Sequence, residues 1–345
     1  MDFRLSVLDQ APVSEGSSGA VALRNSIDLA TLADELGYHR YWVAEHHGTP
    51  GLASAAPEVL IGPIAAATAR IRVGSGGVML PHYSPFKVAE TFSALSGLYP
   101  GRIDLGLGRA SGTDPMTTFA LQRDRHTPSP DDFPEQLAEL LGYLSAELPL
   151  DHPFARLSAT LPGLPERPEP WLLGSSPQSG IWAAGLGLPY AFADFINAAG
   201  AEIAKRYRES VGAGPTLAVA VWAICAETEE EAQRLASSSR MTLRLLGQGR
   251  LIPVPPVEKA LRFLASQPSA VGARERRRRA IIGDPEQVRE GLESVAREYG
   301  ADELMVVTIT HDHGARRRSY ELIAEAVGAG PAGGAAGVAM ASPGG

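Results

Sequence analysis

The sequence predicts an α/β fold, a (β/α)8 TIM barrel with an insertion before the last βα unit. Runs of strand length alternate with helical patterns along the 345 residues, and several strands are continuous apolar runs, as in parallel sheets covered on both faces. An open doubly wound sheet is the main alternative. Against it, no strand is followed by a true G-x-G-x-x-G, because GLGRASG (106–112) has the wrong spacing. Right-handed parallel crossovers therefore favour closure of eight such units.

The expected strands are rich in β-branched, aliphatic and aromatic residues, and each is followed by a segment of helical length. The strands are expected at residues 3–8, 40–44, 71–75, 102–107, 170–174, 190–193, 216–226 and 303–309. The helices are expected at residues 20–37, 57–69, 85–98, 132–146, 176–187, 199–211, 229–246, 285–300 and 315–326.

The chain is expected to form one barrel domain over residues 1–327. Residues 247–280 interrupt the alternation and are interpreted as a lid or mobile insertion, since loops of this length are usually functional or disordered. The charged run at 274–279 is interpreted as a solvated face. Residues 328–345 are rich in Gly, Ala and Pro and are expected to be a disordered tail.

Composition excludes several classes of function. The net charge is −8, and 28 Arg and 3 Lys form no basic domain or tail, which argues against nucleic-acid binding. The chain has no stretch of about 18 consecutive apolar residues and no signal-peptide pattern at its start, so neither a membrane span nor export is expected. The single Cys225 allows no internal disulfide and suits a cytoplasmic protein.

The expected carboxyl ends of the strands carry small residues rather than acids. VGSGGVML (73–80) contains Ser75 and Gly76, GLGR (106–109) ends in Arg109, and GSSPQSG (174–180) opens a helix. Exposed backbone N–H groups at a helix start, with an arginine beside them, are what a phosphate needs. The side-chain-poor wall would let a planar ring lie against the backbone. The alternative is that these glycines only permit tight turns.

Glu45, His46 and His47 end the second expected strand and could be a metal site, a catalytic base or a polar rim. Adjacent strand residues point to opposite faces, so the two histidines are not expected to share a metal. His311 and His313 have better ligand spacing. A catalytic zinc site needs three protein ligands, and no further ligand is convincingly placed. No metal is therefore expected.

Five regions, in the right order, resemble the bacterial luciferase-like flavin monooxygenases, and the resemblance runs from about residue 5 to 326. They are WVAEHHG (42–48), VGSGGVMLPHYSPFKVAE (73–90), LYPGRIDLGLGRASGTDP (98–115), LLGSSPQSGIWAAGLGLPYAFAD (172–194), and GDPEQVREGL with YGADELMVVT (283–292 and 299–308). The resemblance implies a luciferase-like barrel that holds reduced FMN, or in some branches coenzyme F420, in its mouth.

The resemblance also assigns residues to roles. His46 falls on the active-site histidine, and Ser75-Gly76 on a pair that forms a non-prolyl cis peptide behind the flavin. Gly108 stands where the luciferases have a reactive cysteine, and is expected to leave room near the flavin. The expected phosphate-binding residues are Arg109, Ser175, Ser176 and Ser179, with Arg123 or Arg125 as a second arginine.

The implied reaction is that of reduced FMN with O2 to give a C4a-peroxyflavin, which epoxidises or hydroxylates an organic substrate. The Arg-, Ala-, Gly- and Pro-rich composition is typical of actinobacteria, where relatives act on aromatic polyketides in antibiotic biosynthesis. His46 is expected to change charge near neutral pH and to transfer a proton or stabilise the peroxide. Glu45, His47, Tyr83 and Trp222 are candidates for the substrate pocket, although aromatic residues on strands are more often core.

The expected partners follow from the same resemblance. No nicotinamide-binding motif is visible, so a separate NAD(P)H-dependent flavin reductase is expected to supply reduced FMN in a two-component system. A homodimer is also expected, as in many relatives. Two alternatives stay open: an F420-dependent hydride-transfer enzyme, and a non-catalytic flavin-binding subunit.

Overall fold

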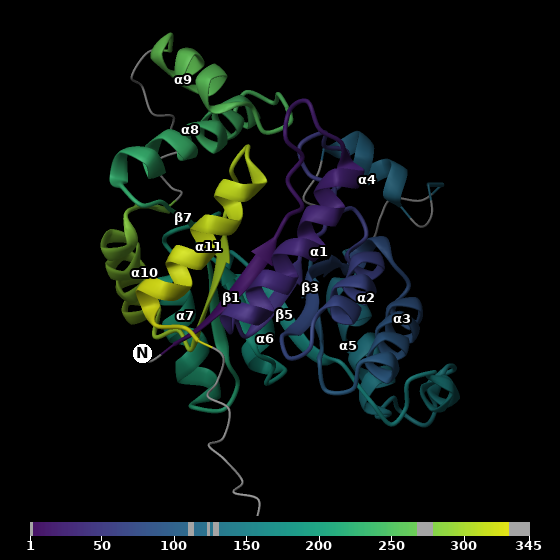
Figure 1. The fold of residues 1–345 in the computed structure, drawn as a ribbon. Helices are drawn as coiled ribbons and strands as arrows, with labels where there is room; N and C mark the ends of the chain where they lie inside the picture. Colours follow the sequence, from purple (N-terminus) through teal and green to yellow (C-terminus); the bar gives the residue numbers. More distant parts are fainter. Residues whose placement is uncertain (1–2, 110–113, 123–124, 127–130, 268–278, 331–345) are drawn as a thin grey trace, which may run out of the picture.

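The computed structural model describes residues 3–109, 114–122, 125–126, 131–267 and 279–330, which form a closed parallel barrel (Figure 1). The strands are β1 (Arg4–Asp9), β2 (Arg40–Val43), β3 (Arg72–Met79), β4 (Ile103–Gly108), β5 (Glu169–Gly174), β6 (Tyr190–Ala193), β7 (Leu217–Cys225), β8 (Ala280–Gly283) and β9 (Glu303–Val307). Their order is β6-β5-β4-β3-β2-β1-β9-β7-β8, and a further β6–β7 pairing closes the ring. The prediction of a (β/α)8 barrel is confirmed.

Helices surround the ring, and α1 and α11 pack side by side in front of β1 in Figure 1. They are α1 (Gly19–Leu36), α2 (Pro57–Ala67), α3 (Pro85–Leu98), α4 (Pro115–Leu121), α5 (Phe133–Ser145), α6 (Pro177–Gly185), α7 (Ala201–Val211), α8 (Glu229–Leu246), α9 (Val257–Ala265), α10 (Pro285–Tyr299) and α11 (His313–Val327), with 3-10 turns η1 (Leu80–His82) and η2 (Ala155–Thr160). Local signals fix many ends: Ser18 caps α1, and Gly37 ends it in the left-handed conformation.

One strand was not predicted. One edge of β7 pairs with β9. Along the other edge, the first half of β7 pairs with β6 and the second half, Trp222 to Cys225, pairs with β8. β8 therefore extends the sheet beyond β6 and is not one of the eight ring strands. The predicted insertion at 247–280 contains α9. Residues 268–278, with most of the charged run, and 331–345, with most of the predicted tail, lie outside the described residues.

The amino end of the barrel is filled by a buried ionic network. The Arg40 guanidinium lies 2.8 Å from Asp104, 2.9 Å from Glu169 and 3.2 Å from Glu303. It also lies 4.6 Å from the centre of the Trp171 ring. These side chains close the amino end of the barrel, so the barrel opens at its carboxyl end. None of the described helices is long and apolar enough to cross a membrane.

Candidate functional site

The carboxyl end of the barrel holds a cavity of about 490 Å³, the barrel mouth, to which all eight ring strands contribute lining residues. Most of the wall is apolar, with Leu8, Trp42, Leu173, Phe195 and Met305 among its side chains. A concave, mainly apolar cavity with a few polar groups is the usual form of a small-molecule site.

Eight of the predicted site residues line this cavity: Glu45, His46, Gly76, Gly108, Arg109, Ser175, Ser176 and Ser179. Four do not. Ser75 is fully buried and donates a hydrogen bond to the Gly106 carbonyl at 2.9 Å. His47 and Tyr83 contact Glu45, and Trp222 packs in an apolar cluster with Ile224.

One end of the mouth gathers polar groups around Arg109. The Arg109 guanidinium lies 5.7 Å from the centre of the Trp182 ring, a cation–π distance. Ser176 is the N-cap residue of α6, but its hydroxyl makes no capping hydrogen bond, which leaves it able to bind a ligand. The Ser179 hydroxyl lies 2.8 Å from the Ser176 carbonyl and 2.8 Å from the Tyr190 hydroxyl, so it shapes the loop. We call Arg109, Ser175 and Ser176 the serine–arginine corner.

The predicted second arginine is not found at this corner. Arg125 donates to the Ala120 carbonyl at 2.7 Å and does not line the cavity. Arg123 lies outside the described residues.

The glycine-rich wall on β3 differs from the expectation in two details. The non-prolyl cis peptide joins Gly76 to Gly77, not Ser75 to Gly76. A Cβ on Gly76 would lie 2.5 Å from Leu8 Cδ1 and 3.0 Å from Trp42 Cβ, so a side chain there would have to displace Leu8. A Cβ on Gly108 would lie 3.2 Å from Met79 Cε. The room expected beside Gly108 is therefore partly filled by the Met79 thioether.

His46 lies on the mouth with an unused nitrogen. Its backbone N–H donates to the Ser54 carbonyl at 2.9 Å, while Nδ1 is buried and has no hydrogen-bond partner in the structure. Burial, and then the nearby His47, lower the pKa of His46 to about 4. The expectation that His46 changes charge near neutral pH is therefore wrong: the imidazole is neutral there, because burial disfavours its charged form.

Glu45 is 1% exposed and connects three segments at the edge of the mouth. Its carboxylate accepts hydrogen bonds from the Met79 backbone at 3.0 Å and from the Tyr83 hydroxyl at 3.0 Å, and lies 2.7 Å from His47 Nε2. Burial and the charge of Glu45 raise the pKa of Tyr83, so its hydroxyl remains a donor. Glu45 thereby fixes the His46 loop to the end of β3.

The alternative metal ligands do not converge. His311 Nε2 lies 3.3 Å from the Glu15 carbonyl, whereas His313 Nε2 lies 2.8 Å from Asp28 Oδ2. Within the described ranges, no group of three or more His, Cys, Asp or Glu side chains is arranged to hold a metal ion.

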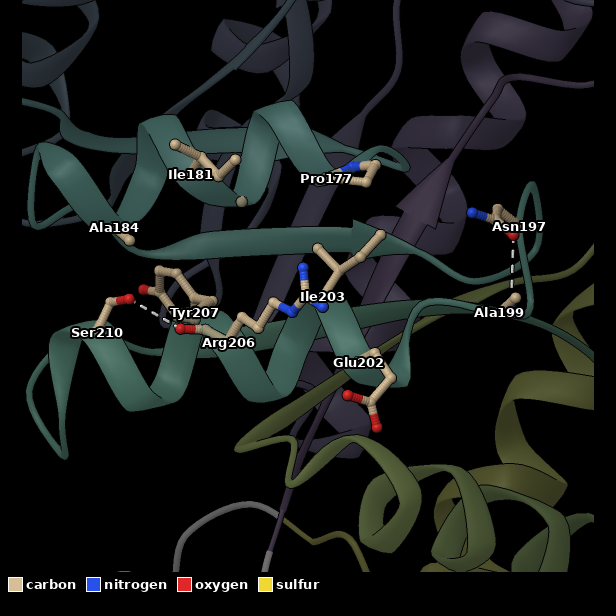
Figure 2. Close-up of a pocket in the computed structure, with 11 residues that line it drawn as sticks. Pro177, Ile181, Ala184, Asn197, Ala199, Glu202, Ile203, Arg206, Tyr207 and Ser210 are labelled. Carbon is tan, nitrogen blue, oxygen red and sulfur yellow. Dashed lines mark hydrogen bonds between the residues drawn. The ribbon is translucent and has the colours of Figure 1, made fainter.

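A second cavity of about 350 Å³ lies outside the barrel, between α6 and α7. Figure 2 shows Ile181 of α6 above Ile203 and Tyr207 of α7. It contains none of the predicted site residues and is separate from the mouth.

Four residues that line the mouth were not among the predicted site residues: Gln10, Met79, Gln178 and Trp182. Met79 and Gln178 stand inside the quoted stretches VGSGGVML and GSSPQSG, in which only glycines and serines were assigned roles. Gln10 stands at the end of a predicted strand and shares the side of β1 on which Leu8 lies, and this alternation is the signal that could have placed it.

The chain is similar to known proteins over most of its length. The family model described as luciferase-like monooxygenase matches residues 1–303. A luciferase-like monooxygenase of Escherichia coli K12 is 42% identical, over 92% of this chain and 95% of its own length. An N-acetyl-S-alkylcysteine monooxygenase of Bacillus subtilis is 39% identical, over 94% and 98%. The crystal structure of apo-MsnO8 superposes with a TM-score of 0.87 at 43% identity, over 95% of this chain and 99% of that one.

Proposed function

This chain belongs to the luciferase-like monooxygenase family, and we propose that it binds reduced FMN in the barrel mouth and transfers one oxygen atom from O2 to an organic substrate. When bound, reduced FMN would supply the two electrons of the reaction, so that the second oxygen atom leaves as water. The chain would supply the binding, orientation and exclusion of water that such a cofactor needs.

The observation that carries this proposal is the distribution of polar groups in one apolar cavity. The serine–arginine corner offers a guanidinium and the start of α6 to a phosphate. The glycine wall of Gly76 and Gly77 presents backbone to the same cavity. The residues present therefore fit a molecule that combines a phosphate with a flat ring system.

His46 is the group that we propose to act on protons in the mouth. It is neutral at pH 7, so one ring nitrogen can accept a proton or hydrogen bond while the other donates. Nδ1 is buried without a partner, so Nε2 is the ring nitrogen that a molecule in the mouth would reach.

The substrate class is proposed from the cavity wall. The large apolar side chains Phe195, Ile196 and Leu173 favour a mainly apolar organic molecule. An aromatic polyketide meets this description, and so does a thioether of the kind named for the Bacillus subtilis relative. We further propose that an NAD(P)H-dependent flavin reductase supplies the reduced cofactor.

The proposal is tested first by binding. Titration of the purified chain with FMN, reduced FMN and F420 is expected to give the highest affinity for reduced FMN. Arg109→Ala is expected to weaken FMN binding about 10- to 100-fold, since hydrogen bonds to charged groups contribute about 1.5–3 kcal/mol. Preferred binding of F420, or equal FMN binding by the variant, would contradict the assignment.

The second test follows the reaction. Reduced FMN is bound without oxygen, O2 is then admitted, and the flavin absorbance and oxygenated product are followed with thioether and aromatic substrates. His46→Ala is expected to keep FMN binding and to lose oxygenation about 10²- to 10⁴-fold, the usual size of general acid–base catalysis. Substantial oxidation of NADH by the chain alone with FMN would argue against a separate reductase.

A further inference from the structure

A second polar group faces the mouth from the end of β1. Gln10 directly follows β1, is 8% exposed, and lines the cavity with Leu8 two residues before it. Among the described residues, no protein group hydrogen-bonds to its side-chain amide. The oxygen and nitrogen of this amide stay accessible inside the cavity, so a bound molecule can reach both.

The backbone around Gln10 is held in an uncommon conformation. Ala11 has φ of 46°, in the left-handed region that residues other than glycine rarely occupy. Asp9, fully buried, accepts a hydrogen bond from the Ala11 N–H at 2.7 Å and from Arg316 at 2.7 Å. The Ser54 hydroxyl donates to the Gln10 carbonyl at 3.1 Å. Strained residues fixed in this way gather at functional sites.

The ring of strands places Gln10 across the mouth from the serine–arginine corner. In the closed order β1-β2-β3-β4-β5-β6-β7-β9, β5 is four strands from β1 in either direction. Ser175 follows β5, and His46 follows β2 beside Gln10. The cavity is therefore polar at two opposite ends, with Leu8, Trp42 and Met305 among the apolar residues of its wall.

We propose that Gln10 binds the imide edge of the flavin ring, with its amide N–H donating to a ring carbonyl and its carbonyl accepting from the ring N–H. This inference rests on the proposed function. The pyrimidine edge of a flavin offers one N–H donor between two carbonyl acceptors. A carboxamide is complementary to this edge, because it carries both an N–H donor and a carbonyl acceptor. Gln10 would then orient the ring while the opposite corner holds the phosphate.

The test separates ring contacts from phosphate contacts. Dissociation constants of FMN and of riboflavin, which lacks the phosphate, are measured by flavin fluorescence quenching. Gln10→Leu is expected to weaken both flavins by a similar factor of about 10, the value of one to two hydrogen bonds. Arg109→Ala is expected to weaken FMN alone. Gln248→Leu is the control, because this glutamine follows α8, is exposed and does not line the mouth, so riboflavin binding should be unchanged.

A ring analogue provides a second readout. Riboflavin methylated at the imide nitrogen is expected to bind the native chain more weakly than riboflavin, and the difference should disappear in Gln10→Leu. Methionine is close to glutamine in shape, so Gln10→Met controls for misfolding. This variant should show the same loss of affinity with an unchanged melting temperature.

Two results would overturn the inference. The first is that Gln10→Leu and Gln10→Met leave riboflavin binding unchanged. If Arg109→Ala still weakened FMN binding in that case, the proposed function would stand and only the role of Gln10 would be refuted. The other is a rise in substrate KM with unchanged flavin affinity, which would assign Gln10 to the substrate. If the native chain bound no flavin, the proposed function would fail as well.

Discussion

Single buried polar side chains hold the mouth together, and Glu45 is the clearest case. Its carboxylate joins the loop after β2 to η1 through the Met79 N–H, the Tyr83 hydroxyl and His47. The side chain is 1% exposed, and these three groups are its hydrogen-bond partners. The donors around Glu45 therefore depend on it.

Replacing Glu45 with alanine is expected to reduce the free energy of unfolding by about 3 kcal/mol, because each buried donor left unsatisfied is unfavourable by about 1–3 kcal/mol. Urea denaturation followed by circular dichroism measures this change. Glu90→Ala is the control, since Glu90 pairs with the exposed Lys87 at 3.4 Å and such pairs contribute little. Equal effects of the two substitutions would refute the assigned role of Glu45.

At the residue scale, the sequence predicted which residues lie at the mouth better than it predicted where their side chains point. His46, Gly76 and Arg109 lie on the mouth, as the strand-end pattern and the family resemblance indicated. Tyr83 and His47 turn to Glu45 instead, because a buried carboxylate attracts the donors within reach. The pKa of His46 depends on burial, which the order of residues does not give.

At the element scale, the close pairing of β3 with β4 depends on glycine. These strands approach so closely that a Cβ on Gly106 would overlap the carbonyl oxygen of Ser75. The register between β3 and β4 also shifts between Ser75 and Val78, beside the glycine wall. A side chain at Gly106 would push the two strands apart.

Gly106→Ala is therefore expected to lower the free energy of unfolding by about 1–3 kcal/mol or more, as overpacking does. Gly185→Ala is the matched control: a Cβ there meets nothing within 4 Å, and alanine is favoured over glycine in a helix by about 0.5–1 kcal/mol. Thermal unfolding compares the two variants. A Gly106→Ala protein as stable as the native chain would show that the strands can separate without loss.

Two of the elements that were missed are short. β8 is only Ala280–Gly283 and follows the charged run, and its first residue fell in the predicted insertion. α4 is the seven-residue Pro115–Leu121, and none of its residues is buried. The third strand was expected to stop at Ser75 but continues to Met79, since its glycines resemble a turn while its neighbours hold it extended.

The stability of the whole molecule is expected to depend on two partly buried histidines. Burial lowers the pKa of both His39 and His46 to about 4; the charges of Arg40 and Arg4 add to the effect at His39, and His47 adds to it at His46. Both stay neutral in the folded chain, whereas in the unfolded chain they take up a proton near pH 6.5. The unfolded state therefore binds more protons between about pH 6.5 and 4, and stability falls as the pH falls through this window.

Between pH 7 and pH 5 each histidine is expected to remove about 1–2 kcal/mol from the free energy of unfolding. Urea titrations at several pH values measure this slope. The double variant His39→Gln, His46→Gln should show a shallower decline. An equal slope in the double variant would refute the assignment.

The filled floor of the barrel has a consequence for how molecules enter and leave during turnover. Trp42 and Trp171 meet edge to face, with ring centres 5.1 Å apart, above the ions that surround Arg40. Neither ring is exposed to solvent, so this end offers no second exit. Every molecule that binds in the mouth then enters and leaves at the carboxyl end of the barrel, so flavin and substrate would share one entrance.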